Sequence, residues 1–360
     1  MGEVVKRIGN NEYLYFQHRI KMDNQTKVIT TQIGKSNLKE EELNIRRKEA
    51  FKTHYRKLWD IEYENNRKIK YKFEIVSKEY ETFLIELKTL YKLIKKFIPE
   101  EEFKLIDKKR FYNHVYGTTH IEGNAIAYND VVKILDQEKT PSNYRINDIN
   151  EVYNYLLFKS FTSHKKGNII DEKLIKKIHS LLLNGIIKTS ISGERKQIPL
   201  GKYRKGEARL IGIPFIVSPP ELIEQRIEYI LNEYHEKIRN KIHPFEAATI
   251  FHQEFEEIHP FTDGNGRTGR EILNFMLEIN EYPPVYLNER AEKRYFDALE
   301  KGNSKDHIPL LEFVADMMFL TVFYYYDEPS LGEYIEENLK SILFTSIKLR
   351  TGVEVNKFKL

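Results

Sequence analysis

Apolar positions along this chain recur mostly every three or four residues, the spacing of amphipathic helices. From Leu38 to about Phe97 the chain has strong helix formers and neither glycine nor proline, which predicts one or two long, highly charged helices. Shorter helical patterns follow, separated by polar breaks. Their predicted spans are 103–117, 127–136, 146–162, 171–184, 221–239, 244–258, 268–280, 289–301 and 308–325.

Two segments depart from the helical pattern. Residues 12–34 are rich in Tyr, Ile, Val and Thr around "DNQ", which predicts a β-hairpin. Residues 190–220 contain four glycines and four prolines beside "ARLIGIPFIV", which indicates a hairpin or an extended flap among helices. We therefore expect a mainly α fold with small hairpins, divided into 1–97, 98–326 and a C-terminal helical tail, 327–360.

Charge limits the classes of partner. The 58 basic and 54 acidic side chains leave a net charge of +4, which weighs against nucleic acid as the main partner, because DNA binding normally uses a one-sided basic surface. The chain has no cysteine, so disulfides, thiol catalysis and cysteine-containing zinc sites are excluded.

The N-terminal residues lack the apolar core of a secretory signal. The longest apolar run, Met317 to Tyr326, is about half the length that spans a bilayer. We expect a soluble, cytoplasmic protein with no membrane partner.

The richest stretch is "HPFTDGNGRTGR", residues 259–270. Its glycines, Gly264, Gly266 and Gly269, match the dinucleotide-binding pattern, but that pattern requires a preceding strand. The preceding "FEAATIFHQEFEEI" has a helical apolar stripe, so the match is accidental. A P-loop is excluded as well, since no Lys-Ser or Lys-Thr pair follows the second glycine.

What remains is a helix, a glycine loop and a second helix, whose first amides can bind an anion. Arg267 lies in the first helical turn, where a cation is unfavourable unless an anion is usually present. Asp263 is placed to hold Mg²⁺ together with phosphate oxygens. His259 has the pKa range of a general base. A plain polar turn is the alternative interpretation, and "HPF" at His243, which has no such loop, is interpreted as structural.

The stretch resembles the signature of Fic-domain enzymes: His-Pro-Phe, two residues, Gly-Asn-Gly-Arg, two residues, Arg. It agrees at every fixed position, and the resemblance covers roughly residues 100 to 325. The surrounding "IEGNAIAYNDVVKIL", "GKYRKGEARLIG", "SPPELI" and "NEYPP" agree with it. The resemblance implies a Fic-type helical bundle with a β-hairpin flap.

The resemblance also implies an activity, the transfer of AMP from ATP to a Ser, Thr or Tyr hydroxyl of a target protein. His259 would deprotonate the hydroxyl, Asp263 would hold Mg²⁺, and Arg270 would pair with the γ-phosphate. The flap would hold the target segment by strand addition. The residues that the resemblance assigns to ATP binding are Gly264, Asn265, Gly266, Arg267 and Arg270.

A second constellation, "TTHIEGN" at residues 118–124, would by itself be a polar helix end with a glycine cap. It resembles the family's inhibitory motif, here Thr118, Glu122 and Gly123. The resemblance implies a bidentate ion pair between Glu122 and Arg270 that keeps the arginine from the γ-phosphate. Because the motif precedes the signature, the chain is similar to the subclass that is inhibited by its own helix.

Several alternatives stay open. Relatives that transfer phosphate carry lysine in place of the second glycine, so Gly266 favours AMP transfer, while removal of AMP from a modified target is a further possibility for Glu122. A third class is a nucleotide-regulated binding module. The first hundred residues could pack on the catalytic domain, select the target or form a homodimer.

Overall fold

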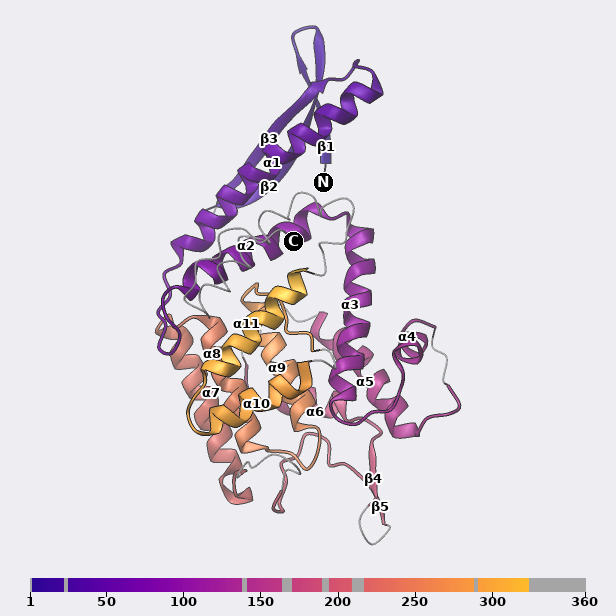
Figure 1. The fold of residues 1–360 in the computed structure, drawn as a ribbon, viewed down its shortest axis with the longest axis vertical. Helices are drawn as coiled ribbons and strands as arrows, with labels where there is room; N and C mark the ends of the chain where they lie inside the picture. The colour runs from indigo at the N-terminus through magenta and orange to yellow at the C-terminus, as the bar shows by residue number, and fades with distance from the viewer. Residues whose placement is uncertain are drawn as a thin grey trace. The chain divides into compact units, whose positions relative to one another are not determined.

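The computed structural model describes residues 2–22, 25–137, 141–163, 170–189, 194–208, 217–287 and 291–323. It is mainly helical, as predicted. The chain divides into two compact units, and Figure 1 labels their elements. One unit holds residues 1–70, 79–106 and 322–360, and the other holds residues 71–78 and 107–321. The predicted tail, 327–360, lies outside the described residues.

The first unit contains a three-stranded antiparallel sheet in the order β1-β2-β3. Its strands are β1 (Gly2–Ile8), β2 (Asn11–Met22) and β3 (Gln25–Lys35). The predicted hairpin is therefore β2 and β3, and the prediction missed β1. Gly9 has φ +60°, which suits the tight turn that joins β1 to β2.

Two helices complete this unit and confirm the prediction of long charged helices. They are α1 (Glu40–Lys68) and α2 (Tyr80–Phe97). The apolar face of α2 is closely packed, because Leu84, Leu87, Leu90 and Leu93 are fully buried. Burying each such side chain stabilises the fold by about 2 kcal/mol. Helix α3 (Glu100–His120) begins in the first unit and continues in the second.

The second unit is a helical bundle. Its further helices are α4 (Tyr128–Gln137), α5 (Ile146–Ser163), α6 (Glu172–Leu182), α7 (Ile223–Arg239), α8 (Pro244–Ile258), α9 (Asn265–Ile279), α10 (Glu292–Asn303) and α11 (Ile308–Phe323). A short 3₁₀ turn, Pro220–Leu222, precedes α7. Helix α9 packs against α8 and α6, and α8 also packs against α7. The predicted helices are confirmed, with ends shifted by a few residues.

The segment 71–78 belongs to the second unit because Glu246 of α8 holds it. The buried Glu246 carboxylate accepts hydrogen bonds from the amides of Glu74 (2.9 Å), Ile75 (3.2 Å) and Val76 (3.2 Å). The adjacent His243 caps α8 by accepting from the Phe245 amide at 3.1 Å. This is the structural role expected of His243.

Part of the predicted flap is described. Strands β4 (Ile187–Thr189) and β5 (Arg195–Gln197) form a two-stranded antiparallel sheet. The flap prediction for residues 190–193 and 209–216 lies outside the described residues. In the described part of the chain, no helix is both long enough and apolar enough to cross a bilayer.

Candidate active site

A cavity of about 570 Å³ lies in the second unit, beside the glycine loop. His259, Asp263 and the three residues that follow it line one side, and Glu122 lines another. The remaining lining residues are Lys188, Arg204, Gly206, Glu207, Ala208 and Thr262. The structure thus gathers five of the predicted signature residues and one predicted inhibitory residue around one space.

His259 lies where α8 ends. Its backbone is in the left-handed region, with φ 49° and ψ 59°, and its amide donates to the Phe255 carbonyl at 3.0 Å. This conformation is uncommon for a residue other than glycine, and it ends the helix at the cavity. Burial lowers the pKa of His259 to about 4, and the nearby Arg204 also lowers it. The imidazole is therefore neutral at pH 7 and can accept a proton.

Asn265 locks the loop that follows. Its Oδ1 accepts from the Phe261 amide and its Nδ2 donates to the Phe261 carbonyl, both at 2.8 Å. Phe261 is fully buried and stacks on His179, with the ring centroids 3.8 Å apart. The side chain of Asn265 thus shapes the loop, and the amide of its main chain is the group left for the expected phosphate contact.

Gly264 must be glycine for two reasons. Its φ is +74°, and a Cβ on it would collide with the side chain of Leu183. Helix α9 starts at the next residue, and the first amides of a helix have no acceptor within it. These amides are the groups that the sequence predicts to bind an anion.

Two buried residues that sequence reasoning missed hold this turn. His179 of α6 accepts from the Gly201 amide through Nδ1 (2.9 Å), so its Nε2 carries the proton and donates to the Asp263 carbonyl (3.1 Å). Arg204 donates through Nε to the carbonyl of His259 (2.8 Å) and through Nη2 to that of Ile258 (3.3 Å). A cation at the carboxyl end of α8 also complements the helix dipole.

Asp263 is ionised and already has partners. Burial raises the pKa of its carboxyl, but Arg267 and Lys188 lower it more, and the net shift is downward. Its Oδ1 accepts from the Gly264 amide at 2.7 Å, and its Oδ2 lies 2.9 Å from Nζ of Lys188. An ionised carboxylate on a cavity fits a magnesium ligand, but Lys188 must leave Oδ2 for a cation to bind there.

Arg267 is buried and paired within the protein. Its Nη1 lies 2.8 Å from Oε1 of Glu151, and its Nη2 lies 3.4 Å from Oδ1 of Asp263. Asn124 in turn donates to Oε2 of Glu151 at 2.9 Å. A cation in the first turn of a helix is unfavourable without an anion beside it, and here the carboxylates of Glu151 and Asp263 are the anions beside Arg267.

Arg270 is held by the predicted inhibitory motif. Its Nη2 donates to Oε1 of Glu122 (2.7 Å) and to the Thr118 carbonyl (3.0 Å), while its Nε donates to Oγ1 of Thr118 (2.8 Å). The ion pair joins one nitrogen to one oxygen, so the expectation of a bidentate pair was wrong. Nε of the guanidinium donates to Thr118, which is fully buried, and not to Glu122.

Glu122 is a charged ligand of Arg270 in this arrangement. Burial raises the pKa of Glu122, but Arg270 and Arg267 outweigh it and the net pKa is lowered. Gly123 has φ +87°, so it caps the end of α3 as the sequence suggested. Gly266 leaves room for the pair, since a Cβ there would lie 2.5 Å from Oε1 of Glu122 and 2.9 Å from Nη1 of Arg270.

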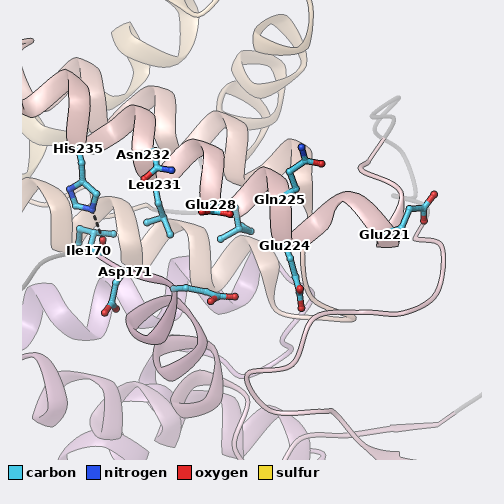
Figure 2. Close-up of a pocket in the computed structure, with 11 residues that line it drawn as sticks. Ile170, Asp171, Glu221, Glu224, Gln225, Glu228, Leu231, Asn232 and His235 are labelled. Carbon is cyan, nitrogen blue, oxygen red and sulfur yellow. Dashed lines mark hydrogen bonds between the residues drawn. The ribbon is translucent and has the colours of Figure 1, made fainter.

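A second cavity, about 710 Å³, lies between the start of α6 and helix α7 (Figure 2). None of the predicted site residues lines it. Most of its carboxylates, among them Asp171, Glu224 and Glu228, are exposed, and His235 donates to the Ile170 carbonyl at 2.7 Å. The predicted chemistry therefore belongs to the smaller cavity.

Comparisons with known proteins agree with this geometry. Residues 169–277 match the sequence model of the Fic/DOC family. The chain is 27% identical over 211 residues to a protein adenylyltransferase Fic of Drosophila virilis and 29% identical over 212 residues to that of Drosophila melanogaster. Each match covers 58% of this chain but only 41% of the fly protein.

Two solved structures share the fold. Fic-1 (residues 134–508) of C. elegans has a TM-score of 0.57 and 21% identity, covering 85% of this chain and 80% of its own. A Fic family protein of Desulfovibrio desulfuricans has a TM-score of 0.56 and 21% identity, covering 78% and 90%. The fold is a helical bundle that places a glycine loop and the start of a helix beside a cavity. Residues 169–277 are thus similar in sequence to the Fic/DOC family, and the fold is similar to that of solved Fic structures.

Proposed function

We propose that this protein transfers AMP from ATP to a hydroxyl side chain of a protein target. The observation that carries the proposal is that the neutral imidazole of His259 and the anion-binding start of α9 open onto one cavity. The fly relatives are protein adenylyltransferases, which supports the same reaction.

In the reaction, the target hydroxyl oxygen attacks the α-phosphorus and gives its proton to His259. The bond between the α-phosphorus and the bridging oxygen breaks, and pyrophosphate leaves with that electron pair. The amides at the start of α9 and the guanidinium of Arg267 stabilise the charge on the phosphates. Arg270, once released, binds the γ-phosphate.

Mg²⁺ is the cation that we propose for Asp263, because it favours one or two carboxylates with phosphate oxygens as its other ligands. When bound, it neutralises phosphate charge. Among the described residues, no group of three or more His, Asp or Glu side chains could hold a metal ion alone, which fits a cation that arrives with the nucleotide.

The contact between Glu122 and Arg270 supports self-inhibition. Arg270 is nearly fully buried, and its guanidinium donates hydrogen bonds to Thr118 and Glu122. The γ-phosphate and Glu122 would compete for Nη2. A site whose arginine is held in this way binds ATP without the γ-phosphate contact, so α-phosphate positioning is lost.

The described two-stranded sheet of β4 and β5 supports the expected docking of the target by strand addition. Main-chain pairing would place a hydroxyl near His259 with little side-chain specificity. We propose a cytoplasmic setting. The division of the chain at residues 97 and 326, and a homodimer formed by the first hundred residues, stay predictions.

Labelled ATP tests the reaction. The Glu122→Gly variant is incubated with α-labelled or γ-labelled ATP and a cell extract, and His259→Ala in the same background is the control. We expect protein-bound label from α-labelled ATP alone, and none in the control. Protein-bound label from γ-labelled ATP would show phosphate transfer instead. Release of AMP from a pre-modified target as the main reaction would show that the enzyme chiefly removes AMP.

A binding module regulated by nucleotide is the competing class. It predicts that a His259→Ala chain keeps its biological effect, because the partner contact would not need the base. Loss of that effect in a folded His259→Ala protein supports the enzyme.

A further inference from the structure

The two faces of the N-terminal sheet differ in chemistry. Helix α1 packs on one face, where Phe16 meets Phe51 edge to face, with the ring centroids 6.0 Å apart. Ile20 and Ile29 are buried on the same face, and Glu3 pairs with Arg47 of α1 at 2.9 Å. This face forms part of the core of the first unit.

Strand alternation places a different set of residues on the opposite face. The register aligns Lys6 with Tyr13, Tyr15 with Gln32, and Arg19 with Val28. We call this the outer face. Its residues are Val4, Lys6, Tyr13, Tyr15, Gln17, Arg19, Lys21, Thr26, Val28, Thr30, Gln32 and Lys35.

The outer face carries four basic side chains, Lys6, Arg19, Lys21 and Lys35, and no acidic one among its described residues. All twelve residues of the face are exposed or half-exposed, and Val28 is 49% exposed. The near-neutral charge of the whole chain thus includes one sheet face that is locally basic. Net charge argued against nucleic acid, but the distribution by face points the other way.

We propose that the outer face binds double-stranded DNA. Its basic groups match phosphates, and the amides of Gln17 and Gln32 with the hydroxyls of Thr26 and Thr30 are groups that contact base edges and phosphates. The major groove of B-DNA admits β-ribbons, and sheets are used in this way by several DNA-binding proteins. The inference stands apart from the AMP-transfer site.

A duplex is favoured over a single strand because one of the two tyrosine rings of this face, that of Tyr15, is already engaged within the sheet. Binding of single strands depends on bases that stack on open aromatic rings. Here Nζ of Lys6 lies over the Tyr15 ring, 5.0 Å from its centroid, and the Tyr15 hydroxyl donates to Oε1 of Gln32 at 3.4 Å. That ring is part of a cross-strand cluster rather than a free stacking platform.

Fluorescence anisotropy of the full chain with a labelled duplex of about 21 base pairs, two helical turns, tests the proposal between about 50 and 200 mM salt. The test variant is Arg19→Ala with Lys21→Ala. The matched control is Arg7→Ala with Lys27→Ala, which removes the same charge from the same sheet on the opposite face.

We expect the wild-type chain and the control to bind the duplex. The test variant loses two phosphate contacts, each worth about 0.9 in the slope of the logarithm of the association constant against the logarithm of the salt concentration. The magnitude of that slope should therefore fall by about 1.8, which is about 60-fold weaker binding at 0.1 M salt. His259→Ala should bind like wild type. Equal weakening of both double variants, tighter binding of single-stranded RNA, or no duplex binding at low salt would overturn the proposal.

Discussion

Replacing Glu122 by glycine removes the carboxylate that engages Arg270 and leaves the rest of the arginine's environment in place. Nε still donates to Oγ1 of Thr118, and Nη2 still donates to the Thr118 carbonyl. The guanidinium therefore stays satisfied and positioned, and the carboxylate no longer competes with the γ-phosphate.

The size of the effect follows from the single bond that is lost. A hydrogen bond between charged groups contributes about 1.5–3 kcal/mol, and each 1.4 kcal/mol is tenfold in an equilibrium. Because the side chain of Glu122 is 23% exposed, solvent screening favours the lower part of this range. We expect Glu122→Gly to raise AMP transfer by about 10- to 40-fold, which corresponds to about 1.5–2.2 kcal/mol.

The assay is the initial rate of incorporation from α-labelled ATP into the chain itself and into extract proteins. Glu122→Gln is the matched control: it keeps a hydrogen-bond acceptor without the charge, so its rate should fall between those of wild type and Glu122→Gly. A Glu122→Gly protein that is folded but no faster than wild type refutes the inhibitory role.

Three further outcomes follow from the same contacts. Burial lowers the pKa of His259 to about 4, so the imidazole stays in its base form above that pH. The rate of AMP transfer should therefore lose the contribution of this base only as the pH falls through about 4. Asn265→Ala removes two hydrogen bonds to Phe261 and should lower the free energy of unfolding in urea by about 2 kcal/mol. Gly269→Ala, whose Cβ would collide with the buried Glu256 carboxyl and lie 3.0 Å from the Phe255 ring, should cost about 1–3 kcal/mol in the same assay. Gly206→Ala, with open space around it, should change little.

The signature loop was predictable because its chemistry is contiguous. His259, Asp263 and the glycines lie within a few residues, and an apolar stripe on each side marks the flanking helices. The pairing of Arg270 with Glu122 joins residues 148 positions apart, and only the resemblance to the family suggested it. Only one hydrogen bond joins Arg270 to Glu122, because Thr118 accepts the other two from the same guanidinium. The spacing of the residues in the sequence does not reveal this arrangement.

The supporting residues could not be found in this way. Arg204 donates hydrogen bonds to main-chain carbonyls more than fifty positions away. Every residue has such a carbonyl, so the sequence does not indicate which ones Arg204 binds. His179 resembles any helical histidine until the Gly201 amide fixes its tautomer. Strand β1 was missed because its apolar residues, Val4, Val5 and Ile8, do not alternate with polar ones.

Intact mass spectrometry of the purified Glu122→Gly chain after incubation with ATP and Mg²⁺ tests the central claim most directly. The account predicts a mass increase equal to one or more AMP groups, with an equal amount of pyrophosphate released, and no change when His259→Ala is added to the same chain. An increase equal to phosphate, or an AMP adduct that persists without His259, would contradict it.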